Sequence, residues 1–249
     1  MSPDLRLRKV YPYFRNNPHS VVGLTQGDLL GLAGVYGYVL CVLAVAWSMK
    51  GKVRNQRKLV HILTGGIVFF WWSFDTREVM AGLAAFPFVV LLLLATPRSP
   101  VAFLRDSPFG ARSSEGHPYG LVMYSLSWTL IAYFLFDDLY AGSIAIAAMS
   151  FGDGMGELVG RRFGKREYMP HRTLEGTFAV FVGVLLSILA LYLFYFELIN
   201  YPTSPPALLP VFAVVVAALV ALLEAITPGS VDNVVIPLAV AFLLTTMGV

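Results

Sequence analysis

The sequence predicts an all-α membrane protein, a polytopic transmembrane bundle of seven or eight helices. Three observations lead to this fold class. First, 57% of the 249 residues are hydrophobic and only 13% are charged, about half of the roughly 25% that is usual in soluble domains. Second, apolar runs close to membrane-spanning length recur along the whole chain. Third, the positive charges gather in alternate connections between those runs. A soluble domain could not hide so much apolar surface.

Eight apolar segments are the expected helices, because crossing the hydrocarbon core takes about 20 mostly apolar residues. The second and the last segment are short, so the count is seven or eight. Residues 1–27 are expected to form a basic N-terminal tail, and residues 28–249 a single transmembrane domain. The segments run near residues 28–49, 59–74, 79–96, 119–136, 139–160, 175–196, 207–226 and 234–249.

The connections predict how these helices are oriented. Residues 50–58, 97–118 and 161–174 together hold thirteen lysines and arginines, whereas the alternate internal connections hold only Arg77. The positive-inside rule therefore places the three basic connections in the cytoplasm. A count of eight puts the N-terminus outside, although the tail carries four cations. Three interpretations stay open: a translocated tail, a helix count that is off by one, and an interfacial helix at the headgroup level.

The fifth segment differs from the others because it carries two carboxylates where a lipid-facing helix carries none. Asp153 and Glu157 are four residues apart, so they share one face of a helix, and Arg161 continues that face. Each such residue costs about 2.5–3.5 kcal/mol on insertion scales, and it usually faces a polar cavity or a partner. Two carboxylates followed by a cation suit a site for Mg²⁺ and phosphate. The simpler alternative for Asp153 is a structural ion pair with Arg161 or Lys58.

Glycines recur at a strict spacing of four along the same helix and form a groove on one of its faces. The groove serves either close packing of a neighbouring helix or close approach of backbone N–H groups to phosphate. Gly152 and Gly154 flank Asp153, which favours close approach of a ligand, and we assign both to nucleotide binding. The glycines at this spacing are Gly152, Gly156, Gly160 and Gly164.

The connection after the fifth segment is basic and ends where the next helix is expected to begin. Its cations suit either nucleotide phosphates beside the acidic pair or contacts to anionic lipid headgroups. Thr173 followed by Glu175 is typical of a helix start. The cations are Arg161, Arg162, Lys165, Arg166 and Arg172.

Two further polar clusters lie on the same predicted membrane face. Arg57 and His61 stand one helical turn apart at the start of the second segment, although a lone histidine there is more often an interfacial residue with a hydrogen-bond partner. Glu224 lies at the end of the otherwise apolar seventh segment. Asp232 and Asn233 either cap the last helix or take part in metal or nucleotide binding.

Together these motifs resemble those of the CTP-dependent polyprenol kinases, which include dolichol kinases, phytol kinases and CTP-using diacylglycerol kinases. Residues 152–154 (Gly-Asp-Gly), residues 160–165 (Gly-Arg-Arg-Phe-Gly-Lys) and residues 173–177 (Thr-Leu-Glu-Gly-Thr) look like the family signature. Residues 57–61 are similar to its Arg-Lys-x-x-His element, and residues 224–238 to a late phytol kinase element. The resemblance covers residues 57 to about 240, in order. Residues 173–177 look more like the dolichol kinase version, which leaves the alcohol open.

The resemblance implies a membrane enzyme that transfers the terminal phosphate of CTP to the hydroxyl of an isoprenoid or other lipid alcohol, with Mg²⁺ as cofactor and the active site on the cytoplasmic face. Asp153, Glu157 and Glu224 are the expected metal ligands. Asp153, Glu157 and His61 are the expected catalytic residues, with His61 orienting the alcohol or taking its proton. Membrane lipids are expected partners, and nucleic acid is not. The expected nucleotide contacts are Arg57, Lys58, Gly152, Gly154, Arg161, Arg162, Lys165, Arg172, Glu175, Asp232 and Asn233.

Three other functions fit parts of the pattern. Residues 160–165, together with the later Glu175-Gly176, also resemble the phosphatidate cytidylyltransferases, which use CTP and Mg²⁺ in a membrane but transfer the nucleotide. A transporter also carries intramembrane carboxylates, yet the two halves of this chain show no repeat and its charged motifs lie on one membrane face. A structural membrane protein does not explain Asp153, Glu157 and Glu224 inside apolar segments.

Overall fold

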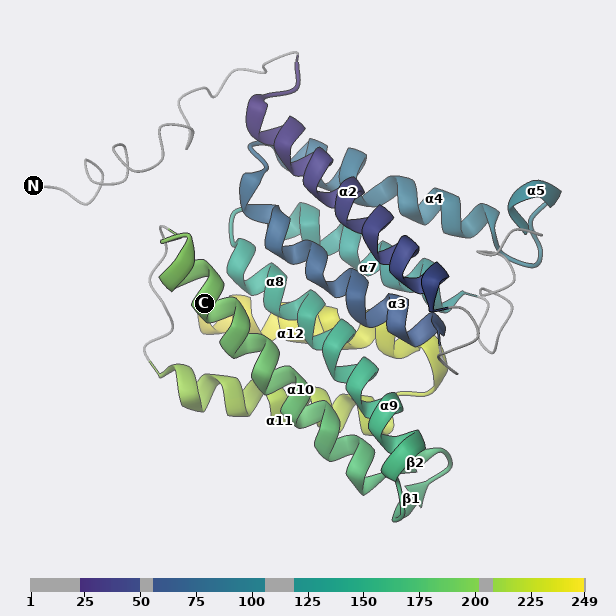
Figure 1. Cartoon of the computed structure of the whole chain (residues 1–249). Helices are drawn as coiled ribbons and strands as arrows, with labels where there is room; N and C mark the ends of the chain where they lie inside the picture. Colours follow the sequence, from purple (N-terminus) through teal and green to yellow (C-terminus); the bar gives the residue numbers. More distant parts are fainter. Residues whose placement is uncertain (1–22, 50–55, 106–118, 202–207, 249) are drawn as a thin grey trace, which may run out of the picture.

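The computed structural model describes residues 23–49, 56–105, 119–201 and 208–248, apart from the side chains of Gln56, Arg57 and Ser230 (Figure 1). Over these residues the fold is all-α, with one small hairpin of two strands. The N-terminal tail predicted for residues 1–27 lies mostly outside the described part.

Every predicted segment contains helix, and several segments are composite. The first three are α2 (Gln26–Ser48), α3 (Gln56–Thr64) running into the 3₁₀ stretch η1 (Gly65–Ser73), and the π stretch η2 (Val79–Ala85) running into α4 (Phe86–Leu94). The fourth is α7 (Gly120–Phe134), and the fifth joins α8 (Leu139–Ala147), η3 (Ala148–Gly152) and α9 (Asp153–Phe163). The last three are α10 (Leu174–Tyr192) with η4 (Leu193–Leu198), α11 (Leu209–Ile226), and α12 (Asp232–Met247) after the short η5 (Gly229–Val231). A short helix, α5 (Ala102–Arg105), lies in the second basic connection.

Three helical stretches are long and apolar enough to cross a membrane, namely Gln26–Ser48, Leu174–Leu198 and Leu209–Ile226. Large apolar side chains project from their outer faces, and Leu40, Phe178 and Leu222 are all more than half exposed. An exposed apolar surface of this kind marks contact with lipid or with another protein. By length and composition, these helices suit association with a membrane.

The centre of the bundle is α8, whose residues are all buried. It packs against α7, α10, α12 and η1, and its alanines, glycine and serine let these neighbours approach closely. The chain continues from α8 through η3 into α9, so the central helix carries Asp153 to one end of the bundle. The position of the fifth segment therefore follows from its small residues.

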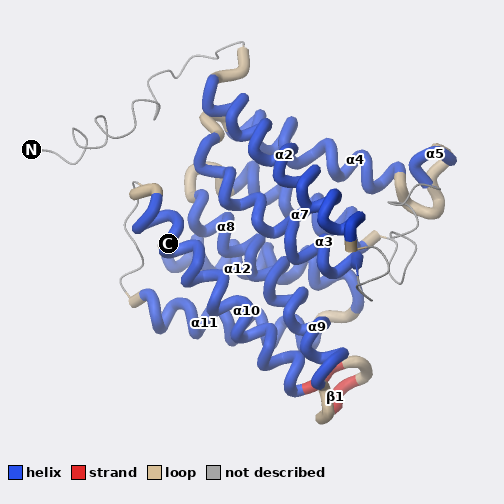
Figure 2. Tube along the Cα trace, in the orientation of Figure 1, coloured by secondary structure: helices blue, strands red, loops and turns tan. Residues whose placement is uncertain are grey.

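The connection predicted as a basic loop instead forms an antiparallel hairpin of β1 (Glu167–Met169) and β2 (Arg172–Thr173). Figure 2 shows these strands beside the end of α9. His171 in the turn has a φ of 64°, and its N–H donates to the Glu167 carboxylate over 2.8 Å. Thr173 then caps α10 by accepting the N–H of Gly176 over 3.1 Å, as the sequence predicts.

Asp232 and Asn233 do not cap the last helix, which was one of the two interpretations left open for them. Val231 is the N-cap of α12 and makes no side-chain cap bond. Asp232 stands inside the first turn, where its carboxylate accepts the N–H of Asn233 over 2.7 Å. Because the carboxylate is buried and does not cap the helix from outside, the capping interpretation does not explain why an acid stands there.

Candidate active site

A polar cleft of about 1140 Å³ opens where α9, the β1–β2 hairpin, the end of α11 and the start of α12 meet. The beginnings of α3 and α10 complete its walls. Segments that are far apart in the sequence therefore contribute to one site. The predicted site residues that line it are Lys58, Asp153, Glu157, Arg161, Arg172, Glu224, Asp232 and Asn233.

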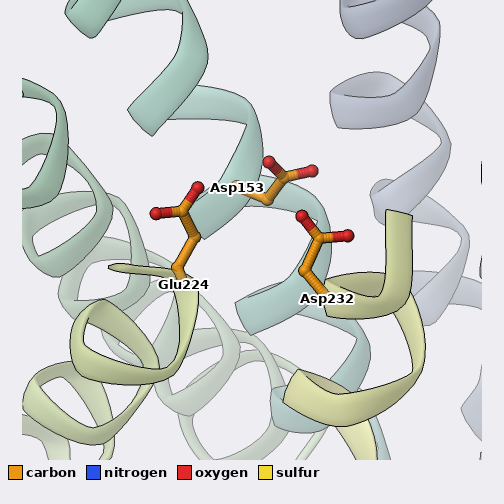
Figure 3. Close-up of side chains that lie close together, drawn as sticks. All are labelled: Asp153, Glu224 and Asp232. Atoms are coloured by element: carbon orange, nitrogen blue, oxygen red, sulfur yellow. The ribbon is translucent and has the colours of Figure 1, made fainter. Parts of the chain in front are cut away.

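Three buried carboxylates meet in this cleft (Figure 3). Asp153 comes from the first turn of α9, Glu224 from the end of α11, and Asp232 from the first turn of α12. One oxygen of each lies within 4.8 Å of the others, although each residue is at most 7% exposed. Three carboxylates this close repel one another when ionised, so the site needs compensating cations.

Lys58 of α3 supplies the first cation. Its Nζ lies 2.5 Å from Oδ2 of Asp153 and 3.2 Å from Oε2 of Glu157. Arg161 contacts the other oxygen of Glu157 over 3.0 Å. Lys58 of α3 thus lies between the two acids of α9, and Arg161 follows them on the face that the spacing of four predicts. The ion pair between Asp153 and Lys58 is present, and it lies within a larger polar cleft.

Arg172 of β2 supplies the second cation. One of its guanidinium nitrogens forms an ion pair with Glu224, and the other donates to the carbonyl of Thr227 over 3.1 Å. Thr227 is the residue at which α11 ends, so its carbonyl has no partner within the helix. Arg172 therefore fixes the hairpin to the end of α11 and closes one wall of the cleft.

His61 reaches the same acid from the next turn of α3. Its Nε2 lies 3.4 Å from Oδ2 of Asp153, and its ring centroid is 4.4 Å from that of Tyr124 in α7. His61 is 5% exposed, and it lines a neighbouring apolar cavity instead of the polar cleft. Asp153 therefore stands between Lys58 on the cleft side and His61 on the apolar side.

The carboxylate cluster suits a hard divalent cation. Mg²⁺ takes oxygen ligands at about 2.0–2.1 Å, so two of its ligands lie at most about 4.2 Å apart. One oxygen of each acid lies within 4.8 Å of the others, which is close to this spacing. The sequence predicts Glu157 as a ligand with Asp153 and Glu224, whereas the structure places Asp232 in the cluster. Glu157 lies one turn further along α9, between Lys58 and Arg161.

Several predicted nucleotide contacts are not among the residues that line the cleft. The guanidinium of Arg162 lies 5.4 Å from the ring centre of Phe163. The carboxylate of Glu175 accepts the backbone N–H groups of Lys165 and Arg166 over 3.1 and 3.3 Å. Glu175 thus holds the chain between α9 and β1 in place. The side chain of Arg57 lies outside the described part.

Packing accounts for the glycines around Asp153. A Cβ added to Gly152 would lie 2.8 Å from Val184 of α10, and one added to Gly154 would overlap Ile62 of α3. Further along α9, the close approach is at Gly176 of α10, where an added Cβ would lie 3.1 Å from the carbonyl oxygen of Gly156 and 3.3 Å from the Cα of Gly160. Gly156 and Gly160 also line the cleft, so phosphate approach remains open for these two.

Sequence reasoning did not find three groups at this site. Glu167 lines the cleft and steadies the hairpin turn, and the carbonyl of Thr227 receives Arg172. The run Thr227-Pro228-Gly229 is a helix-stop signal. It could have indicated a carbonyl close to Glu224 that has no hydrogen bond within the helix. Tyr124, which lies against His61, stands in an apolar run with no signal to single it out.

The chain is similar to several proteins that are named phytol kinases. The chain is 34% identical over 257 residues to the probable phytol kinase 1, chloroplastic, of Glycine max, covering 95% of this chain and 82% of the relative. It is 31% identical over 222 residues to phytol kinase 1, chloroplastic, of Arabidopsis thaliana, covering 84% and 71%. It is 28% identical over 234 residues to the phytol kinase of Synechocystis, covering 92% and 94%. No family model matches the chain, and neither does a solved structure.

Proposed function

The chain belongs to the phytol kinase family, and on this premise we propose that it transfers a phosphoryl group from a nucleoside triphosphate to the hydroxyl of an isoprenoid alcohol. The relatives' names supply the reaction class. The geometry of the polar cleft supplies the physical support, since phosphoryl transfer depends chiefly on positioning and on neutralising charge.

One observation carries the proposal: buried acids and basic side chains from α3, α9, β2, α11 and α12 meet in a single open cleft. Burying so many ionisable groups is costly in free energy unless they are paired or bind a ligand. The cleft is also large enough for a nucleotide, because sites for drug-sized ligands occupy about 300–1,000 Å³.

The basic side chains are the proposed phosphate contacts. Arg161 is 70% exposed at its side chain and stands at the mouth of the cleft, where it can reach a triphosphate without breaking buried contacts. Lys58 and Arg172 lie deeper, on Asp153 and Glu224. CTP is the proposed donor, on the resemblance of residues 152–177 to the CTP-using kinases.

Mg²⁺ is the proposed cofactor, with Asp153, Glu224 and Asp232 as the residues that would hold it. Bound there, the ion would neutralise the charge of the phosphate oxygens. Lys58 and Arg172 each contact one oxygen of a ligand carboxylate. These two side chains thereby orient the acids and reduce their mutual repulsion.

His61 is the proposed proton acceptor. The alcohol oxygen attacks the terminal phosphorus, a new O–P bond forms, and the bond from that phosphorus to the bridging oxygen breaks. The nucleoside diphosphate leaves with the electron pair of the broken bond, and the hydroxyl proton passes to His61. Asp153, 3.4 Å from Nε2 of His61, stabilises the imidazolium that results.

The proposed setting is a multi-pass membrane protein of seven or eight spans with the cleft on the cytoplasmic face. The three helices that are long and apolar enough to span a membrane are α2, α10 with η4, and α11. The shorter apolar stretches would supply the remaining spans. The basic connection that forms the β1–β2 hairpin borders the cleft, and the positive-inside rule supports a cytoplasmic location for both.

A matrix of nucleotides and alcohols tests the proposal. The purified protein is incubated with Mg²⁺, with CTP, UTP or ATP, and with phytol, geranylgeraniol, farnesol, dolichol or diacylglycerol, and in a parallel reaction with CTP and phosphatidate. We expect CDP and a monophosphate of an isoprenoid alcohol. Pyrophosphate release from CTP and phosphatidate would show a cytidylyltransferase instead, and no turnover with any pair would contradict the proposal.

The matched variant is Asp153→Asn, which keeps the shape of the side chain and removes its charge. We expect kcat to fall by about 10²–10³-fold, the scale of losing one electrostatic contact to the transition state. Asp137→Asn is the control, because Asp137 pairs with Arg77 and its side chain is 79% exposed. Near-normal phosphorylation by Asp153→Asn would remove Asp153 from its proposed role.

A further inference from the structure

A second cavity lies beside the polar cleft, between α2, α3, α4 and α7. Its volume is about 120 Å³, and its walls are almost wholly apolar, with Leu43, Leu92, Leu121 and Trp128 among the residues that line it. No lysine, arginine or carboxylate is among its described lining residues. The cavity therefore suits an uncharged apolar ligand.

Three polar side chains of this cavity belong to one connected group, whereas the hydroxyl of Ser125 donates to the carbonyl of Val122 in its own helix. His61, Thr64 and Tyr124 line it, and the Tyr124 hydroxyl lies 2.9 Å from Oγ of Ser150 and 3.4 Å from Oγ1 of Thr64. His61 touches Tyr124 on one side and lies 3.4 Å from Asp153 on the other. A ligand in the cavity whose polar end lies at His61 would point that end toward the reacting centre.

We propose that this cavity binds the hydroxyl-bearing end of the isoprenoid alcohol, with the hydroxyl at His61 and the first part of the chain between α2, α3, α4 and α7. The assignment rests on the proposed function, and it names the place where the second substrate lies. An amphiphile with one small uncharged polar group matches a cavity with apolar walls and a single polar side.

The size of the cavity sets how much of the alcohol it holds. At about 120 Å³ it is well below the roughly 300–1,000 Å³ of sites that enclose a drug-sized ligand. It therefore holds the part of the chain next to the hydroxyl, and the remainder extends between the helices toward lipid. The same walls disfavour an anionic lipid headgroup, which would lose its hydration without a cation to compensate.

Photolabelling tests the position of the alcohol directly. The probe is an isoprenoid alcohol that carries a diazirine on the carbons next to the hydroxyl, applied to the purified full-length protein. We expect labelled peptides from α3, α4 and α7, centred on cavity residues such as Leu92, Leu121 and Trp128, and we expect unlabelled phytol to compete. Labels confined to the polar cleft or to outer helix faces would overturn the proposal.

A variant that fills the cavity provides the kinetic test. Ser125 lines it and is 1% exposed, and its hydroxyl donates to the carbonyl of Val122 within α7. We expect Ser125→Leu to raise the KM for the alcohol at least tenfold and to leave the KM for the nucleotide within twofold.

The control is Leu126→Phe, which adds bulk to the same helix at a side chain that is 39% exposed. Equal KM effects from Leu126→Phe and Ser125→Leu would contradict the proposal, because bulk in α7 would then act independently of the cavity. Since Ser125→Leu can also fail to fold, its nucleotide KM and its photolabelling are measured together. Cavity labelling in a protein that phosphorylates no alcohol would support the binding site and overturn the proposed function.

Discussion

At the scale of single residues, Asp153 stands between the polar cleft and the apolar cavity, because it lines the first and contacts His61, which lines the second. Lys58 and His61 contact the same oxygen, Oδ2, from successive turns of α3. Glu224 and Asp232 approach Asp153 from two other helices. A carboxylate that serves only as a structural ion pair needs one partner, whereas this one lies among two basic groups and two acids. Such a group of acids and bases suits the binding of a metal ion together with a phosphate-bearing ligand.

The first prediction concerns the carboxylate cluster. Glu224→Gln and Asp232→Asn should each raise the Mg²⁺ concentration for half-maximal activity by at least about 10-fold, because loss of even an outer-shell partner costs about 10–100-fold in metal affinity. Magnesium titrations at fixed CTP and alcohol measure the change. Glu157→Gln should shift the titration less, because Glu157 is not part of the cluster.

The matched control for this titration is Glu197→Gln, an exposed carboxylate in η4 that should leave the magnesium dependence unchanged. An unchanged half-saturation point in both Glu224→Gln and Asp232→Asn would remove these residues from metal binding. A shift as large in Glu157→Gln would instead support the ligand set predicted from the sequence.

At the scale of elements, the α9–α10 pair positions the site. The glycines of α9 let α10 approach, Thr173 starts α10, and the hairpin before it carries Arg172 to Glu224. The glycine spacing could be recognised from the sequence, but its two interpretations could not be separated there. Choosing between packing and phosphate binding requires knowing which helix covers the groove, and that depends on contacts far apart in the chain.

The second prediction separates those interpretations at Gly152. Gly152→Ala should destabilise the protein by about 1–3 kcal/mol, the usual cost of overpacking, because the added methyl would lie 2.8 Å from Val184. Thermal unfolding in detergent measures the effect. Val184→Ala makes room for that methyl. The double variant should therefore lose about 0.5–3 kcal/mol less stability than the sum of the losses in the two single variants.

Gly82→Ala is the control for this pair, because an added Cβ at Gly82 meets nothing within 4 Å. It should be neutral or slightly stabilising. If Gly152→Ala raised the KM for CTP without changing stability, and Val184→Ala did not reverse that rise, the nucleotide interpretation would hold for Gly152.

At the scale of the whole molecule, the apolar segments and their order could be predicted from the sequence, because each one is a mostly apolar run between polar or charged connections. The places where the regular α-helix is interrupted within these segments could not be predicted. The 3₁₀ stretch after Thr64 and the π stretch before Asp153 break the simple period on which such a prediction depends. The β1–β2 hairpin was missed for a similar reason, since two strands of three and two residues leave no alternating pattern.

The convergence of the polar clusters was predicted from their shared membrane face. The sequence did not show that Asp232 takes the place of Glu157 in the carboxylate cluster, because that depends on how α12 begins.

The third prediction tests the orientation on which the cytoplasmic site depends. Cys41 is the one cysteine of the sequence, so Cys41→Ser gives a background free of thiols. Arg166→Cys, beside the hairpin, should react with a membrane-impermeant maleimide only in inverted vesicles. Asp137→Cys, just before α8, and Glu197→Cys, near the end of η4, belong to the predicted opposite membrane face and should react only in intact cells. Lys9→Cys, in the N-terminal tail, should react in intact cells if there are eight spans and in inverted vesicles if there are seven. The reverse pattern for Arg166, Asp137 and Glu197 would place the cleft on the face away from cytoplasmic nucleotides, and a kinase supplied with nucleoside triphosphate from the cytoplasm could not work in that orientation.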